Sequence, residues 1–268
     1  MTSPSHGTPL ATSSPHDDPA RSEAAVRAVP SSNAAPTGAG KTKTCDEIVR
    51  KAIRGHEFWV GDPRSYPYSQ NIFDDPEPLL ARWTFEPGQV AIDVGASFGV
   101  YTLLALAQSA LCMAFEPSTD GYPVLVRNVA LNGWGERATI IRGALGDGEP
   151  PPEAWAAEVW GQHYPAQDVR WARLDEWPGL RVDKLKVDVE GVEWHVLRGA
   201  YETLKRERPV VLVEVHDGCN AGSQIGLYPE SIGSAGKIEE MLKFLNYEVE
   251  HEQGARRYLI GTPMEKVR

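Results

Sequence analysis

Four titratable side chains stand at the ends of two apolar segments: Asp188 and Glu190 close one, and Glu214 and His216 close the next. If the segments form neighbouring parallel strands, alternation places Asp188 and Glu190 on one side and Glu214 and His216 together. The four groups would then flank one crevice and could divide acid and base roles. An imidazole has an ordinary pKa of ~6.5, so His216 is the first candidate for a catalytic base. Glu190 is the second candidate, because like-charge repulsion from Asp188 would raise the pKa of a buried carboxylate there.

Two other roles are open for the same side chains. Asp188 and Glu190 could brace the helix that follows them, with His216 as a structural histidine at a strand end. The four groups also offer oxygen and nitrogen ligands to a divalent metal that lowers the pKa of a hydroxyl group. Spacing in a sequence does not establish coordination, so a metal is an alternative that we do not favour.

A glycine-containing loop, Asp93-Val-Gly95-Ala-Ser97-Phe-Gly99, is the second group of interest. Glycine lets the backbone approach a ligand closely. The spacing D-x-G-x-x-x-G lacks the glycines of the dinucleotide fingerprint, which favours a ligand without phosphates. Glu116 ends the next apolar segment about 17 residues later, where an acid can bind ribose hydroxyls. Together the loop and the acid fit an adenosyl group.

Alternating strands and helices must position these residues. Short β-branched or apolar runs predict strands, and Ala/Leu-rich periodic runs predict helices. Strands are expected at 89–94, 111–115, 138–142, 183–189 and 209–215, helices at 101–108, 121–131, 192–204 and 237–245, and a final hairpin from 247–251 and 257–260. Helical crossovers between strands imply a mostly parallel sheet covered on both faces, which is a doubly wound α/β fold.

The chain divides into a tail and a domain. Residues 1–44 contain no aromatic residue, and their Ser, Thr, Pro, Ala and Gly predict disorder. Residues 45–268 are expected to form one domain, with a helical or aromatic cap at about 45–86. Residues 35–42 look like a phosphate loop, and 47–54 could be the helix that it opens. The residues before the loop are polar and broken by proline, so we interpret the match as a coincidence.

Composition excludes several classes. The 268 residues hold 27 Lys and Arg against 37 Asp and Glu, a net charge of −10, which argues against a nucleic-acid partner. No segment is long and apolar enough for a membrane span, and no secretory signal is visible, so a cytoplasmic location is expected. Three widely spaced cysteines indicate neither a disulfide framework nor a zinc site.

Six motifs follow one another in a specific order and spacing. In this combination the chain resembles the FkbM family of S-adenosylmethionine-dependent methyltransferases over about residues 89–217. The motifs are 93–102, Phe115–Pro117, Asn128–Asn132, Leu174–Glu176, Lys186–Glu193 and Leu197–Ala200. The resemblance implies a class I methyltransferase sheet, Rossmann-like and mostly parallel with a reversed edge strand. It also implies S-adenosyl-L-methionine as the cofactor and O-methylation of a hydroxyl on a small molecule, sugar, glycan or natural product. A methyltransferase acting on protein or nucleic acid, and a cofactor-binding protein without catalysis, are the alternatives.

The resemblance also assigns site residues. The glycine loop would face the methionine part of the cofactor, Glu116 the ribose, and Ala144 and Leu145 the adenine. The full set expected at the cofactor is Asp93, Gly95, Ala96, Ser97, Gly99, Tyr101, Thr102, Glu116, Ala144, Leu145 and Asp188. Aromatic segments at 57–83 and 148–177 and the loop 220–236 are candidate lids over the acceptor. The acceptor molecule and the oligomeric state are left open.

Overall fold

The computed structural model describes residues 47–61, 73, 78–150, 169–216, 234–253 and 257–266. The expected tail and its phosphate-loop lookalike lie outside these residues. So do much of the aromatic segment 148–177 and nearly all of the loop 220–236. Among the described residues, none of the helices has the length and apolar character needed to cross a membrane.

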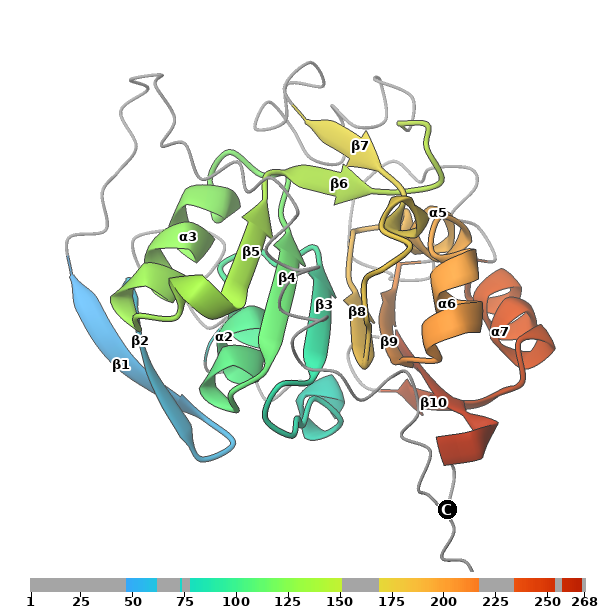
Figure 1. Ribbon diagram of the computed structural model, residues 1–268, viewed down its shortest axis with the longest axis horizontal. Helices are drawn as coiled ribbons and strands as arrows, with labels where there is room; N and C mark the ends of the chain where they lie inside the picture. Colours follow the sequence, from blue (N-terminus) through green and yellow to red (C-terminus); the bar gives the residue numbers. More distant parts are fainter. Residues whose placement is uncertain are drawn as a thin grey trace, which may run out of the picture.

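The centre of the molecule is a seven-stranded sheet in the order β10-β11-β9-β8-β3-β4-β5 (Figure 1). Its strands are β3 (Val90–Val94), β4 (Leu111–Phe115), β5 (Ala138–Ile141), β8 (Lys184–Val187), β9 (Val210–Val215), β10 (Tyr247–Gln253) and β11 (Arg257–Pro263). The pairs from β5 to β9 are parallel, and β11 is antiparallel to both of its neighbours. This confirms the doubly wound, mostly parallel class I sheet.

The reversed strand differs from expectation in its position. β11 lies one place in from the edge, and β10 is the edge strand. Burial explains the order: Tyr258, Leu259 and Ile260 of β11 are at most 2 % exposed, whereas β10 carries the exposed Glu248 and Glu250. A strand that is apolar on both faces belongs inside the sheet, while charged residues suit an edge.

Helices cover both faces of the sheet (Figure 1). Alternate residues of β3 belong to different cores: Val90 and Ile92 pack in the core that includes α5 and α6, and Ala91 packs with α2 and α3. The helices are α2 (Val100–Ala107), α3 (Gly121–Leu131), α5 (Glu193–Arg198), α6 (Tyr201–Glu207) and α7 (Ser234–Phe244). A short parallel pair, β6 (Gly143–Leu145) and β7 (Arg170–Ala172), and the 3-10 turns η2 (Pro78–Ala81), η3 (Gly135–Arg137), η5 (Leu174–Glu176) and η7 (Met264–Lys266) complete the described part.

The prediction of a single helix at 192–204 is wrong, because the structure has two separate helices there, α5 and α6. A Cβ on Gly199 would lie 1.8 Å from the backbone oxygen of Gly146, so this position packs directly against another segment. Asp175 of η5 accepts hydrogen bonds from the amides of Glu202 and Thr203 at 3.0 and 2.8 Å. These bonds satisfy donors at the start of α6, so the second helix begins there.

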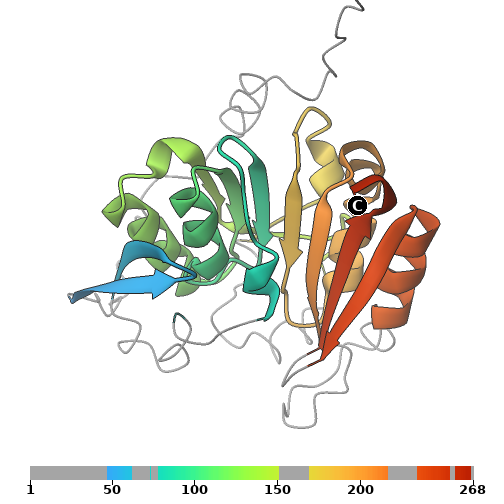
Figure 2. The same ribbon diagram turned by 90° about the horizontal axis from the view of Figure 1, so that it is seen from below.

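A β-hairpin occupies residues 48–61, so the described part of the 45–86 cap is not chiefly helical. β1 (Ile48–Ile53) pairs antiparallel with β2 (His56–Gly61) through a turn at Arg54 and Gly55, with φ of 51° and 82°. Exposed and less exposed residues alternate along β1, which is the period of a strand. Figure 2 shows the hairpin outside α2 and α3, the helices that β2 packs against.

Two asparagines of the motif Asn128–Asn132, at the end of α3, bind this hairpin. Asn132 accepts the Trp59 amide at 2.8 Å and donates to the Trp59 carbonyl at 2.7 Å. Asn128 accepts the Gly61 amide at 2.9 Å and donates to the Phe98 carbonyl at 2.9 Å. Asn128 therefore joins the hairpin to the glycine loop.

Three of the candidate lid aromatics belong to the core instead. Phe58, Phe73 and Trp83 are 2, 4 and 0 % exposed. The indole of Trp83 donates to the Tyr101 carbonyl at 2.8 Å. Interpreting these three as a lid is therefore wrong, because apolar burial holds them in place. Tyr66 and Tyr68 lie outside the described residues.

Candidate active site

The glycine loop crosses the carboxyl end of β4. Three of its residues have left-handed backbone, with φ of 75° at Gly95, 50° at Ser97 and 98° at Gly99. The amides of Gly95 and Ala96 both donate to the Phe115 carbonyl at 3.0 Å. A Cβ at Gly95 would lie 1.8 Å from the backbone oxygen of Asp188. Glycine is required there because the loop packs directly on the chain leaving β8.

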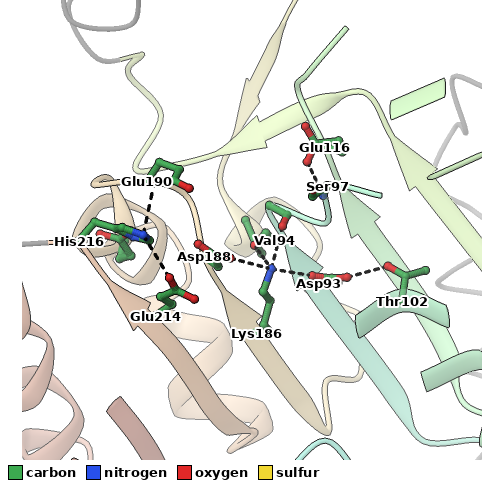
Figure 3. A network of polar contacts seen from close by, with 12 residues as sticks. Asp93, Val94, Ser97, Thr102, Glu116, Lys186, Asp188, Glu190, Glu214 and His216 are labelled. Carbon is green, nitrogen blue, oxygen red and sulfur yellow. Dashed lines mark hydrogen bonds and ion pairs between the residues drawn. The ribbon is translucent and has the colours of Figure 1, made fainter. Parts of the chain in front are cut away.

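Glu116 lies beside Ser97 of this loop (Figure 3). Its side chain is buried, and its carboxylate accepts the amides of Ser97 at 2.6 Å and Ser118 at 2.8 Å. Burial raises the pKa of Glu116 to about 7, and the charge of Asp93 adds to the rise. The two amides and the charge of Lys186 oppose it. A buried carboxylate at a strand end matches the acceptor that a ribose diol needs.

The raised pKa predicts a pH dependence of stability. The folded protein holds the Glu116 proton up to about pH 7, whereas the unfolded chain releases it near the ordinary glutamate pKa of 4.5. The stability from this group is therefore fully present below pH 4.5 and is lost as the pH rises through about 7. Between pH 5 and 8, wild type should lose about 2 kcal/mol of unfolding free energy relative to Glu116→Gln. Urea denaturation of both proteins at the two pH values measures it, and an unchanged difference would contradict the raised pKa.

Lys186 is the buried cation at the centre of the site. Its Nζ donates to the Gly95 carbonyl at 2.7 Å and lies 3.3 Å from Asp93 Oδ1 and 3.7 Å from Asp188 Oδ2. Asp93 is fully buried, and its Oδ2 accepts the hydroxyl of Thr102 at 2.7 Å. The glycine loop is thus supported by a buried group of three side chains, Asp93, Thr102 and Lys186.

Tyr101 lies behind the same support. Its side chain is buried, and the Nζ of Lys186 is 5.1 Å from the centre of its ring. Trp83 packs edge-on against the ring at 5.5 Å. These contacts place the Tyr101 ring in the packing around Lys186.

The cluster at the ends of β8 and β9 brings together the four groups singled out from the sequence (Figure 3). His216 Nδ1 lies 2.9 Å from Glu193 Oε1, while His216 Nε2 lies 3.3 Å from Glu214 Oε1 and 3.4 Å from Glu190 Oε2. Ligand atoms of Asp188, Glu214 and His216 lie within 4.8 Å of one another. The predicted convergence at neighbouring strand ends is therefore present.

Strand alternation does not place Asp188 and Glu190, although it was the expected reason. β8 ends at Val187, and the next residues form a loop in which Glu190 has a φ of 56°. Loop geometry brings the two side chains to the cluster. The side chain of Glu190 is 56 % exposed, against 0 % for Glu193 and 4 % for Glu214.

An ordinary imidazole pKa at His216 is also wrong. Burial by itself would lower the pKa of His216, but hydrogen bonds to Glu193 and Glu214 and the charges of Glu193 and Glu190 raise it to about 11. In this arrangement His216 is an imidazolium at neutral pH. The pKa of Glu190 is raised by loss of hydration and by the charges of Asp188, Glu214 and Glu193, and His216 opposes the rise. The catalytic role of either residue stays a prediction.

Ala144 and Leu145 occupy β6, beyond the end of β5. Leu145 is 1 % exposed and belongs to the hydrophobic core, together with Phe115. Ala144 is also buried. The Glu116 amide donates to the Ile141 carbonyl at 3.1 Å, so the end of β5 lies beside the loop acid. Contact of Ala144 and Leu145 with adenine stays a prediction.

Two residues with central places were not singled out from the sequence. Lys186 belongs to the motif Lys186–Glu193, but it was assigned no role from the sequence. A lysine at a buried position of a strand, here Lys184–Val187, indicates that its charge has a buried partner. Glu193 is fully buried and accepts both the imidazole of His216 and the Gly191 amide at 2.8 Å. No sequence signal links Glu193 to a histidine on another strand.

Comparison with known proteins identifies one family. The model of the methyltransferase FkbM domain matches residues 93–256. Methyltransferase FkbM from Methylobacillus flagellatus KT is 15 % identical, with a TM-score of 0.50 over 75 % of this chain and 48 % of that one. This chain thus spans about half the length of that protein, and the likeness concerns the fold.

Two further solved structures are similar at lower scores. A SAM-dependent methyltransferase from Aquifex aeolicus is 15 % identical, with a TM-score of 0.41 over 71 % of this chain and 94 % of that one. TYW2 from M. jannaschii, solved in complex with AdoMet, is 14 % identical, with a TM-score of 0.41 over 80 % and 84 %. A search of curated proteins finds no match.

Proposed function

The chain belongs to the FkbM family of methyltransferases, and from that premise we propose that it methylates a hydroxyl group of a small molecule, sugar or natural product, with S-adenosylmethionine as the methyl donor. One observation carries the proposal: a carboxylate and imidazole cluster stands at the ends of β8 and β9, next to the loop that ends β3. Proton-accepting groups beside a cofactor loop are what a hydroxyl acceptor requires.

The donor groups of the cofactor match the acceptors that the site offers. Glu116 presents a buried carboxylate at the end of β4, suited to ribose hydroxyls. Asp188 Oδ1 is buried and has no hydrogen-bond partner among the described residues, so it can accept a further polar partner. The backbone of the glycine loop would contact the cofactor at Gly95, Ala96, Ser97 and Gly99. When bound, S-adenosylmethionine supplies an electrophilic methyl group on a sulfonium sulfur.

Glu190 is the residue that we propose as the catalytic base. It is the most exposed of the three glutamates around His216, so an acceptor can reach it. The acceptor hydroxyl would give its proton to Glu190 while its oxygen bonds to the methyl carbon, and the carbon–sulfur electron pair would stay on sulfur. His216 would orient Glu190 from 3.4 Å and stabilise its negative charge. This order reverses the first expectation, in which His216 came before Glu190.

Calorimetric titration with S-adenosylhomocysteine, with Mg-ATP and NAD in parallel, tests the cofactor. We expect S-adenosylhomocysteine alone to bind. Glu116→Ala should weaken its binding at least about tenfold, because the buried hydrogen-bond partner for the ribose hydroxyls is removed. Glu136→Ala, at an exposed residue of η3, is the matched control and should leave affinity unchanged. If ATP or NAD binds and S-adenosylhomocysteine does not, the cofactor proposal is overturned.

The acceptor is tested separately. Methyl transfer from labelled cofactor is measured to a panel of hydroxylated sugars and small molecules, and to protein and RNA fractions. Label on the hydroxyl compounds supports the proposal. Label on protein or RNA alone would favour the alternative acceptor classes, although the net charge of −10 opposes a nucleic acid. Cofactor binding without transfer to any acceptor would favour a non-catalytic binding protein.

A further inference from the structure

Asp188, Glu214 and His216 each bring one potential ligand atom to a common point. The three atoms lie within 4.8 Å of one another, at the ends of β8 and β9. Figure 3 shows Glu214 and Asp188 on the same side of His216. Whereas the sequence did not favour a metal, from this geometry we propose that these three residues bind a divalent cation of the Mn²⁺ or Mg²⁺ class. The binding site follows from geometry alone, whereas a catalytic role for the ion rests on the proposed function.

The orientation of His216 is the first supporting observation. Its Nδ1 lies 2.9 Å from Oε1 of the fully buried Glu193, and the imidazole is the donor in a hydrogen bond to a carboxylate, so Nδ1 carries a hydrogen. The nitrogen left for a ligand is Nε2, which faces Glu214 Oε1 at 3.3 Å. In the imidazolium form this nitrogen carries a hydrogen toward that oxygen, and a divalent cation would take the place of that proton. A buried carboxylate behind the other ring nitrogen is the arrangement that orients histidine ligands of metals.

Unpartnered oxygens are the second, independent observation. Asp188 Oδ1 and Glu193 Oε2 are buried and have no hydrogen-bond partner within the described chain. The Glu193 side chain is 0 % exposed and directed at the imidazole of His216. Buried carboxylate oxygens without partners are costly. A cation beside Asp188 would satisfy one of them directly and would lower the cost of the charge on Glu193.

The local charge balance favours the same conclusion. Asp188, Glu190, Glu193 and Glu214 gather around one imidazole. Lys186 is a nearby cation, but its Nζ is shared between Asp93, Asp188 and the Gly95 carbonyl. Among the described residues of this cluster, negative charge is therefore in excess whether or not His216 is protonated. A divalent cation would reduce this excess.

The donor set selects the class of ion. Two carboxylates and one imidazole form an oxygen-rich set, which suits Mn²⁺ and Mg²⁺ better than metals that prefer thiolates. Three protein ligands also leave coordination positions for water or for an acceptor hydroxyl. An ion there would lower the pKa of that hydroxyl, and Glu190 would remain the group that receives the proton.

Direct binding of Mn²⁺ tests the site without requiring activity. The chelator-treated full-length protein is titrated with MnCl₂ by calorimetry, and its Tm is measured with and without Mn²⁺ and Mg²⁺. We expect one equivalent of Mn²⁺ to bind and the Tm to rise, because the ion binds the folded state. Glu214→Gln and Asp188→Asn should each weaken binding at least about tenfold. Glu239→Gln is the control, since Glu239 pairs with His251 at 3.0 Å on other elements and should keep full affinity.

The outcomes separate the ion from the reaction. Absence of Mn²⁺ and Mg²⁺ binding by wild type, binding of Zn²⁺ alone, or binding that both variants leave unchanged would overturn the proposal. If Glu214→Gln does not fold, Asp188→Asn and the wild-type Tm shift decide. Methyl transfer is then measured with and without EDTA. Transfer that persists in EDTA, together with no ion binding, removes the metal and keeps the proposed function. Ion binding with no transfer to a hydroxyl acceptor keeps the metal and removes that function.

Discussion

Glu190→Gln should lower the turnover of methyl transfer by about 10² or more, while the affinity for S-adenosylhomocysteine stays within about threefold of wild type. The amide keeps the size of the side chain but does not accept the hydroxyl proton. Glu190 lies at the exposed side of the cluster, and its side chain is 56 % exposed, so the substitution should leave the fold intact. Turnover is measured under saturating cofactor, with KM for the acceptor determined in parallel.

The comparison with two other variants makes the base assignment testable. Glu190→Asp retains a carboxylate and should recover part of the lost turnover. Glu240→Gln, on the exposed face of α7, should have no effect. A rise in KM with unchanged turnover would instead make Glu190 an acceptor-binding residue. Unchanged turnover would return the base role to His216, the first candidate from the sequence.

Lys186→Met should lower the free energy of unfolding by about 3 to 5 kcal/mol, because breaking a buried ion pair leaves an unpaired charge in the core. Lys186 is 3 % exposed, and its Nζ lies 3.3 Å from the fully buried Asp93. The same substitution removes the bond to the Gly95 carbonyl, so the affinity for S-adenosylhomocysteine should fall as well. Urea denaturation and calorimetry measure the two effects.

The same strand provides a matched control. Lys184 lies two residues earlier in β8, and its Nζ donates to the Arg82 carbonyl, where no buried carboxylate is left behind. Lys184→Met should therefore cost only about 1 kcal/mol. In the double variant Lys186→Met/Asp93→Asn, part of the loss should be recovered, since both charges are gone. Equal losses for the two lysines would show that the ion pair contributes little.

Local patterns predicted the elements well where burial is regular. β4 and α3 have the predicted bounds, because a short apolar run between turns and a periodic run with a defined end leave few alternatives. The break between α5 and α6 was missed, since it depends on Gly199 meeting the Gly146 carbonyl from a distant segment. The hairpin at 48–61 was missed for a similar reason, because its place is set by packing on α2 and α3.

The site was predictable in outline and not in its partners. Placing Asp188, Glu190, Glu214 and His216 together needed only the rule that parallel strands end at the same edge of a sheet. The pKa of His216 depends on Glu193, which comes from the start of α5, and strand alternation says nothing about that residue. Buried charges are set by tertiary neighbours, and a sequence pattern identifies the face of an element without identifying what lies across from it.

Asn128 joins two segments whose sequences would otherwise vary independently. Its oxygen accepts the amide of Gly61 in the hairpin, and its nitrogen donates to the carbonyl of Phe98 in the glycine loop. Aspartate would lose the donor, and leucine would lose both groups. A shift of either backbone by one residue would break one of the two bonds. The hairpin and the loop are therefore expected to evolve as a pair, so that insertions in one are tolerated only when the other keeps its register.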